Sequence, residues 1–225
     1  MMKTLFGVLV LVFVGVAARA QVVLYSTDFG TGTSLPTGWS VTGTQSGNIE
    51  ISTASASSGY SFPISTSGGS NLNDGAAGTV AGVATVTLSG QINTTGYTSI
   101  QVLYAARKTA SYVGSIAFQW SNDGVIWNSI TYSDVANNAS WSVVNNGTWL
   151  TLPAGAENQA NLRFRFIFTR TSSLPSNYRI DDFTVQGFSP TGTQPSHYFR
   201  SRQSGNWNVS SSWESSANND TWEPS

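Results

Sequence analysis

The sequence contains no cysteine, one histidine and few charged residues: Lys, Arg, Asp and Glu together make up 9% of its 225 residues. Without cysteine, disulfide bonds, thiol catalysis and thiolate zinc sites are excluded. His197 follows two prolines in a polar stretch, so a Ser-His-Asp relay would need a base from outside the segment expected to fold. The fold must therefore be held by its core, helped where possible by a metal ion.

No apolar run is long enough to cross a membrane. The N-terminus has a positive charge at Lys3, fourteen apolar residues from Leu5 to Ala18, and the small-residue junction Ala18-Arg19-Ala20. A membrane span needs about 20 apolar residues, and a secretory leader fits the shorter run better. We predict residues 1–20 to be a signal peptide. The mature chain, without a transmembrane segment, is then expected to be secreted, extracellular or at the cell surface.

The charge balance and the spacing of carboxylates exclude two further classes. Removing Lys3 and Arg19 leaves 10 − 2 = 8 basic against 11 acidic residues, a net charge near −3, which favours neither nucleic acid nor anionic membrane. A glycosidase needs two carboxylates facing each other across a cleft. No such pair is indicated by spacing, so we predict a protein that is not an enzyme, with a glycoside hydrolase or other enzyme fragment as the alternative. The acidic residues considered lie in turn-like surroundings: Glu50, Asp74, Asp123, Asp134 and Glu157.

Short apolar segments separated by Gly, Ser, Thr and Asn predict many strands joined by turns. In the clearest of them, Leu162, Phe164, Phe166 and Phe168 alternate with other residues, the period expected when one face of a sheet packs inward. Further strands are predicted at 79–88, 100–105, 115–121 and 125–130. No stretch has the 3.6-residue period of an amphipathic helix. We therefore predict an all-β fold, an antiparallel β-sandwich of jelly-roll type with an extended C-terminal tail.

Composition divides the chain at residues 189–196, a polar, Pro-punctuated stretch that predicts a linker. Residues 21–188 form the predicted sandwich domain and are numerous enough to bury a core. Residues 197–225 hold three tryptophans in a segment too short to bury them alone. We expect this segment to be poorly ordered, the truncated start of a second module whose downstream partners in the same polypeptide are missing.

Several short motifs, in this order, resemble the N-terminal jelly-roll modules of large secreted Bacteroidota proteins. They are Asp28-Phe29, Leu35-Pro36-Thr37-Gly38-Trp39, Gly68-Gly69-Ser70-Asn71-Leu72, Ser121-Asn122-Asp123-Gly124 with Trp127, residues 161–166 and residues 179–183. Those modules are similar to cleaved-adhesin and MAM-like domains and, more distantly, to carbohydrate-binding modules. The resemblance covers about residues 22–188. It implies a non-catalytic binding or adhesion module of a larger extracellular protein.

In such modules, acidic residues of the first and last strands commonly hold a structural calcium ion. Carried over to this sequence, the resemblance implicates Asp28 and one or both of Asp181 and Asp182 as metal ligands. Adjacent aspartates repel each other unless a cation lies between them. In the alternative interpretation Asp28 caps a turn, Asp182 pairs with Arg179 or another arginine, and Asp181 is solvated.

Aromatic residues offer a second kind of site, since the chain has 8 Trp and 8 Tyr. Exposed rings stack against sugars while arginine and amide side chains bond to hydroxyls. Core packing competes with this role for every ring, and solvation or cross-strand pairing competes for the arginines. Two functions remain open: a glycan- or matrix-directed binding module, or a structural spacer with no ligand beyond its ion. The tentative ligand-binding residues are Trp127, Trp141, Trp149, Tyr112, Tyr132, Arg163 and Arg165.

Overall fold

The structure, a computed structural model, describes residues 19–62, 69–75, 81–190, 198–201, 213–216 and 223–224. Residues 21–189 form one compact unit, and the remaining residues at the two ends are grouped in another. The core of the predicted signal peptide and most of the predicted linker and second module lie outside the described residues. Within residues 197–225, three short strands pair in the order β13 (Tyr198–Ser201), β14 (Trp213–Ser216) and β15 (Glu223–Pro224).

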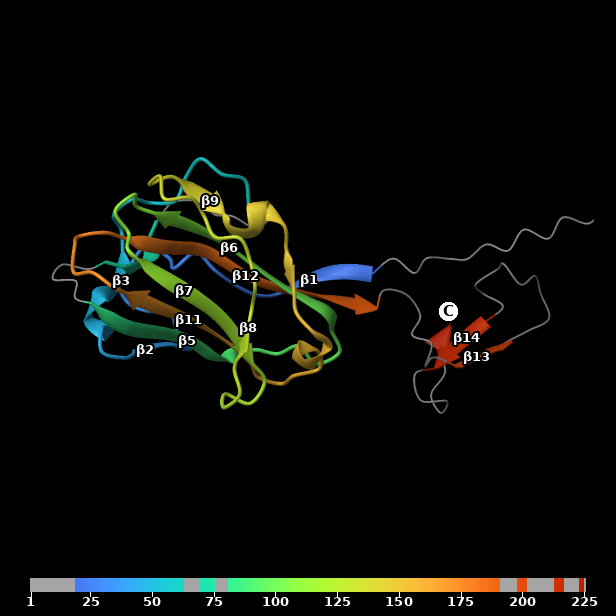
Figure 1. The fold of residues 1–225 in the computed structure, drawn as a ribbon. Coiled ribbons are helices and arrows are strands. Elements are labelled where there is room, and N and C mark those ends of the chain that lie inside the picture. The colour runs from blue at the N-terminus through green and yellow to red at the C-terminus, as the bar shows by residue number, and fades with distance from the viewer. Residues whose placement is uncertain are drawn as a thin grey trace, which may run out of the picture. The chain divides into compact units, whose positions relative to one another are not determined.

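The compact unit is a sandwich of two antiparallel sheets, which confirms the predicted fold class (Figure 1). The seven-stranded sheet contains β1 (Arg19–Thr27), β3 (Ile49–Ser52), β4 (Asn71–Asp74), β6 (Thr98–Lys108), β9 (Trp141–Val143), β10 (Leu150–Thr151) and β12 (Tyr178–Pro190). The five-stranded sheet contains β2 (Trp39–Thr42), β5 (Gly82–Ile92), β7 (Gly114–Ser121), β8 (Asn128–Ser129) and β11 (Leu162–Arg170).

Helical structure is confined to short 3₁₀ turns in the part of the chain that is described. They are η1 (Ser46–Asn48), η2 (Val144–Gly147) and η3 (Ala154–Ala156). None of the described helices has the length and apolarity needed to span a bilayer. The fold is therefore built by strand pairing and by the packing of one sheet on the other.

The core is organised around β11, which lies between β5 and β7. Burial along β11 alternates strictly, as its sequence predicted, with Phe164, Phe166 and Phe168 fully buried. Phe118 of β7 stacks on Phe166 with ring centroids 4.6 Å apart, and Tyr104 of the opposite sheet meets Phe166 edge-on at 5.1 Å. Aromatic packing of this kind ties the two sheets together without a disulfide.

The β7–β8 hairpin forms at the predicted Asp-Gly turn. Asp123 Oδ1 accepts hydrogen bonds at 2.8 Å from the backbone N–H groups of Val125 and Ile126, and Gly124 has φ +78°. The returning strand, Asn128–Ser129, is shorter than the predicted 125–130, and the Ile130 N–H after it still donates to the Phe118 carbonyl of β7. Val125 and Ile126 are left exposed at the tip.

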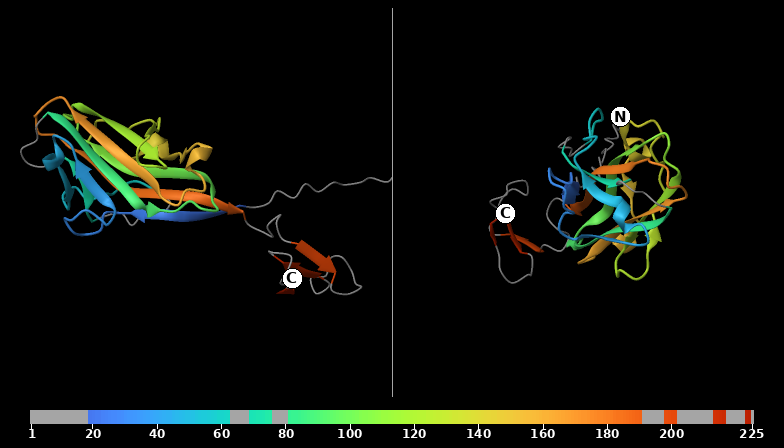
Figure 2. Two further views of the ribbon diagram at one scale, coloured as in Figure 1. Left: turned by 90° about the horizontal axis from the view of Figure 1, so that it is seen from below. Right: turned by 90° about the vertical axis from the view of Figure 1, so that its left-hand side faces the viewer.

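The first and last strands of the unit lie side by side, because β1 pairs with β12 (Figure 2). The strand β12 also pairs with β6 and, near its start, with β4. The β12–β6 register shifts between Asp181 and Thr184, and Asp182 there has φ +50°. This bulge brings two consecutive acidic residues into the middle of the sheet.

Candidate functional site

The three predicted metal ligands lie close enough to affect one another. Asp181 is fully buried, and burial is the main reason why its pKa is raised to about 7; the charges of Asp182 and Asp28 raise it by smaller amounts. The hydrogen bonds that Asp181 accepts from Ser57 and from the N–H of Asp182 oppose this rise. One carboxylate oxygen of Asp181, Oδ2, is buried without a hydrogen-bond partner among the described residues. A buried carboxylate oxygen left open in this way suits a cation.

The structure contradicts one part of the alternative to a metal site, the expectation that Asp181 is solvated. Asp28 does cap a turn, accepting a hydrogen bond from the Gly30 N–H at 2.9 Å. Asp181, however, is buried and not solvated. Asp182 accepts a hydrogen bond from the Tyr60 hydroxyl. Arg179 instead donates to the Asn71 side chain and to a backbone carbonyl.

Acidic and histidine side chains alone do not complete a metal cage here. Within the described ranges, no group of three or more His, Cys, Asp or Glu side chains has an arrangement that could hold a metal ion. Calcium usually takes six to eight oxygens, many of them from carbonyls and water. A calcium ion at Asp181 would therefore depend on backbone oxygens and solvent as much as on the three carboxylates.

A loop that joins β3 to β4 passes over this acidic cluster. We call residues 53–62 of it the cover loop. Arg179 donates to the Ala54 carbonyl at 3.0 Å, Ser57 bonds to Asp181, and Tyr60 donates to Asp182. These three anchors hold the cover loop against β12.

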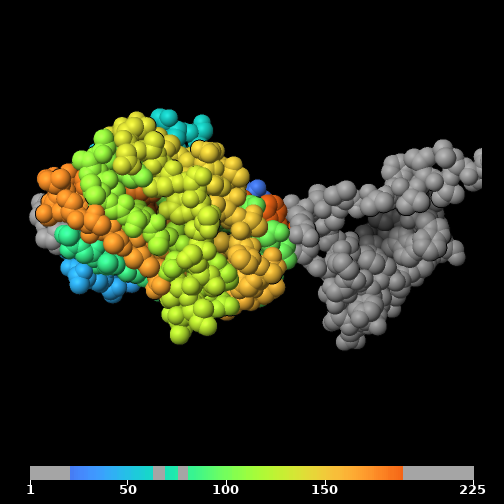
Figure 3. Space-filling view, in the orientation of Figure 1, coloured from blue at the N-terminus to red at the C-terminus, as the bar shows by residue number. Residues whose placement is uncertain are grey.

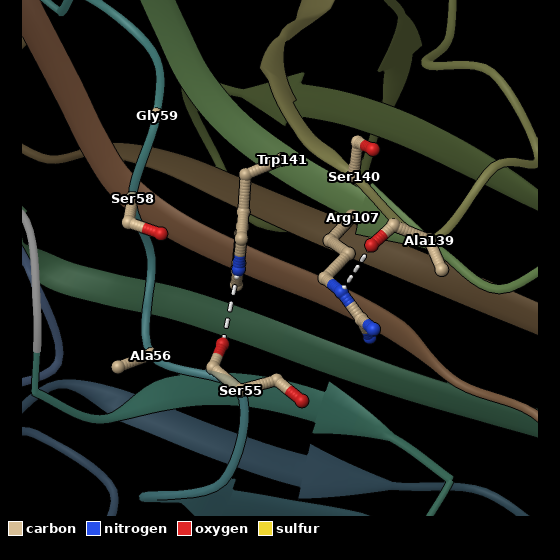
Figure 4. A pocket seen from close by; sticks show the side chains of 8 residues that line it. All are labelled: Ser55, Ala56, Ser58, Gly59, Arg107, Ala139, Ser140 and Trp141. Atoms are coloured by element: carbon tan, nitrogen blue, oxygen red, sulfur yellow. Dashed lines mark hydrogen bonds between the residues drawn. The ribbon is translucent and has the colours of Figure 1, made fainter.

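Two cavities open between the cover loop and the segment around β9, and Trp141 is among the lining residues of both. In the view of Figure 3 the cover loop (cyan) lies beside this segment (yellow) at one edge of the sandwich. The first cavity, drawn in Figure 4, has a volume of about 470 Å³, and the second about 590 Å³. We call the two together the Trp141 groove. The first is lined by Ser55, Ala56, Ser58, Gly59, Arg107, Ala139, Ser140 and Trp141.

The two large side chains that line the first cavity, Trp141 and Arg107, are oriented by hydrogen bonds to backbone carbonyl groups. The indole Nε1 of Trp141 donates to the Ser55 carbonyl at 3.0 Å, and Arg107 Nε donates to the Ala139 carbonyl at 2.7 Å (Figure 4). The ring of Tyr60 lies 6.3 Å from that of Trp141. An oriented indole surrounded by hydroxyl groups and a guanidinium is suited to bind a flat, hydroxylated ligand.

Three of the other residues predicted to bind a ligand gather on the opposite sheet. The guanidinium of Arg165 lies 4.2 Å from the centre of the Trp127 ring and its Nε donates to Gln119. Arg163 donates to the Asn122 carbonyl. Both arginines thus have intramolecular partners, as the cross-strand interpretation anticipated, and this group does not line the cavities described above.

The remaining predicted ligand residues take part mainly in packing. Tyr112 is 5% exposed and donates to buried Asp74, so its ring does not offer a face to a ligand. Tyr132 packs edge-on against Tyr104. Trp149 is half-buried against the core and lines a separate cavity of about 230 Å³.

The sequence predicted a ligand-binding role for Trp141, but it gave no such indication for Arg107 or the cover loop. Arg107 lies at the end of a strand, and the cover loop is a Ser- and Gly-rich stretch with no distinctive pattern. Their proximity to Trp141 comes from contacts between segments 32 and 86 residues apart. No local signal in the sequence carries that information.

No known family profile matches this chain, and no curated protein matches it in sequence. Solved structures similar to it are β-sandwiches of low identity. The CBM22-1 xylan-binding domain of Paenibacillus barcinonensis Xyn10C has a TM-score of 0.43 and 15% identity, over 77% of this chain and 99% of that one. The K1 cleaved adhesin domain of Lys-gingipain from Porphyromonas gingivalis has 0.43 and 14%, over 74% and 97%.

An enzyme domain is also among the similar structures. The enzymatically active domain of tailspike protein 4 of bacteriophage CBA120 has a TM-score of 0.42 and 14% identity, over 68% of this chain and 19% of that one. Carbohydrate-binding modules and cleaved adhesin domains, the classes named from the sequence, are thus among the structures similar to this chain.

Proposed function

We propose that this protein is a secreted, non-catalytic binding module that holds a glycan in the Trp141 groove. The observation that carries the proposal is the indole of Trp141, which is held by its hydrogen bond to the Ser55 carbonyl and lines both cavities. A locked ring loses little conformational entropy when a sugar stacks on it. Serine hydroxyls and the Arg107 guanidinium beside it supply hydrogen-bonding groups for sugar hydroxyls.

The proposal includes a structural calcium ion at Asp181, with Asp28 and Asp182 contributing negative charge. The buried, unpartnered Oδ2 of Asp181 supports it. The ion would neutralise carboxylates that burial and mutual repulsion otherwise destabilise. Because the cover loop is bonded to both Asp181 and Asp182, the same ion would stabilise one wall of the groove.

A glycan array probed with the purified protein in calcium buffer tests the proposed binding function. We expect binding to a restricted set of glycans, and none by Trp141→Ala. Trp127→Ala is the matched control, since it removes an indole from the other sheet and should bind like wild type. An array on which wild type and both variants are equally blank would favour the competing function, a structural spacer with no ligand beyond its ion.

A further inference from the structure

The first cavity of the Trp141 groove carries positive charge that no acidic side chain balances. Arg107 is the one ionisable residue among the eight that line it. The ion pairs found among the described residues are Lys108–Asp134 and Arg170–Asp74, and neither involves Arg107. Its Nε bonds to the Ala139 carbonyl, which orients the guanidinium at the cavity.

A second arginine, Arg179, lies near enough to Arg107 for the two charges to interact. Arg179 is 5% exposed, and its pKa is lowered by burial and, next, by the charge of Arg107, while Glu50 acts in the opposite direction. Its Nε is buried without a hydrogen-bond partner among the described residues. Two nearby guanidinium groups, neither in an ion pair, create a positive potential that an anion would relieve.

Two acidic residues beside the groove, Asp134 and Asp182, have intramolecular partners of their own. Asp134 lines the second cavity, but it pairs with Lys108 at 2.6 Å and accepts a hydrogen bond from Tyr178 at 2.6 Å. Asp182 accepts from Tyr60. Arg107 therefore lines the first cavity, next to the Trp141 ring, with no acidic side chain in the same lining.

We infer that the groove selects an anionic glycan, whose carboxylate or sulfate group binds Arg107 while its sugar ring lies on Trp141. The guanidinium presents two parallel N–H groups that match either acidic group. Hydroxyl groups of Ser55, Ser58 and Ser140 line the same cavity and can bond to the sugar. This inference rests on the proposed function and narrows it to a class of ligand.

The test uses two matched pairs of oligosaccharides, titrated calorimetrically into the full-length protein. One pair is tri-galacturonate and its trimethyl ester, which differ in the charges of their carboxyl groups. The other is a sulfated galactan oligosaccharide and its desulfated form. We expect the acidic member of at least one pair to bind about 10-fold tighter or more than its neutral partner. The pair that shows the preference identifies the acidic group.

Variants of Arg107 then assign the preference to the groove. Arg107→Gln should make the affinities within the pair equal. Arg107→Lys should keep part of the acidic preference, since lysine retains the positive charge but lacks the two parallel N–H groups of the guanidinium. Arg163→Gln, on the other sheet, should behave like wild type. Equal affinities within both pairs, or a preference that survives in Arg107→Gln, would overturn the inference. The proposed function fails separately, if the glycan array is blank for neutral and acidic glycans alike or if Trp141→Ala binds glycans as wild type does.

Discussion

At the scale of single residues, the buried carboxyl group of Asp181 makes the stability of the fold depend on pH. Asp181 has a pKa of about 7 in the folded chain, mainly because it is buried, against about 4 for an exposed aspartate. A pKa raised by folding means that the folded state holds its proton more tightly than the unfolded state does. The stability contributed by the protonated group is complete below pH 4 and is lost as the pH rises through 7.

We therefore predict opposite pH trends with and without calcium. The melting temperature of the calcium-free protein should fall between pH 5 and pH 8, while that of Asp181→Asn should change less. Added calcium should raise the wild-type melting temperature more at pH 8 than at pH 5, because the ion binds the ionised carboxylate. Differential scanning fluorimetry measures both trends. Equal calcium shifts for wild type and Asp181→Asn would contradict the assignment.

Arg170 provides a second prediction at this scale. It is 2% exposed and lies 3.4 Å from an oxygen of buried Asp74, which also accepts a hydrogen bond from Tyr112. Arg170→Met should lower the free energy of unfolding by about 3–5 kcal/mol at pH 7, because it leaves a buried carboxylate without its counter-charge. Lys108→Met, at the more exposed ion pair, should cost about 1 kcal/mol or less. Similar losses for the two variants in urea denaturation would refute this distinction.

At the scale of elements, the alternation along β11 predicted its burial residue by residue, because a strand with one face on the core has a period of two. The length of β8 was not predictable in the same way. A hairpin turn can be read from Asp123-Gly124, but its stabilisation by bonds from Val125 and Ile126 to Asp123 delays the return of the chain to the sheet. At the tip of the hairpin, the N–H groups of Val125 and Ile126 bond to the Asp123 side chain and not to the neighbouring strand.

The two faces of β11 should respond differently to truncation. Phe166→Ala should lower the free energy of unfolding by about 3–5 kcal/mol. Phe166 packs against rings of both sheets, so its truncation would leave a cavity in the core. Ile167→Ala, one residue further on the half-buried outer face, should cost clearly less. Urea denaturation of both variants measures the difference, and equal losses would show that the outer face is also a core.

At the scale of the whole molecule, local patterns predicted the sandwich, while the candidate site depends on contacts across the chain. The sequence predicted site roles for Trp141, Asp28, Asp181 and Asp182. It predicted none for Arg107 or the cover loop, because hydrogen bonds between distant segments bring them to Trp141. For Tyr112 the prediction was a ligand-binding role, but the side chain is buried, and its hydroxyl donates a hydrogen bond to the buried Asp74.

The most direct test of the account is the location of glycan binding on the molecule. Calorimetric titration with the best glycan from the array should show an affinity loss of about 10-fold or more for Trp141→Ala. Trp127→Ala should bind as wild type does, and both variants should keep the wild-type circular dichroism spectrum. If Trp127→Ala loses binding while Trp141→Ala retains it, the site lies on the other sheet, and the proposed role of the Trp141 groove is wrong.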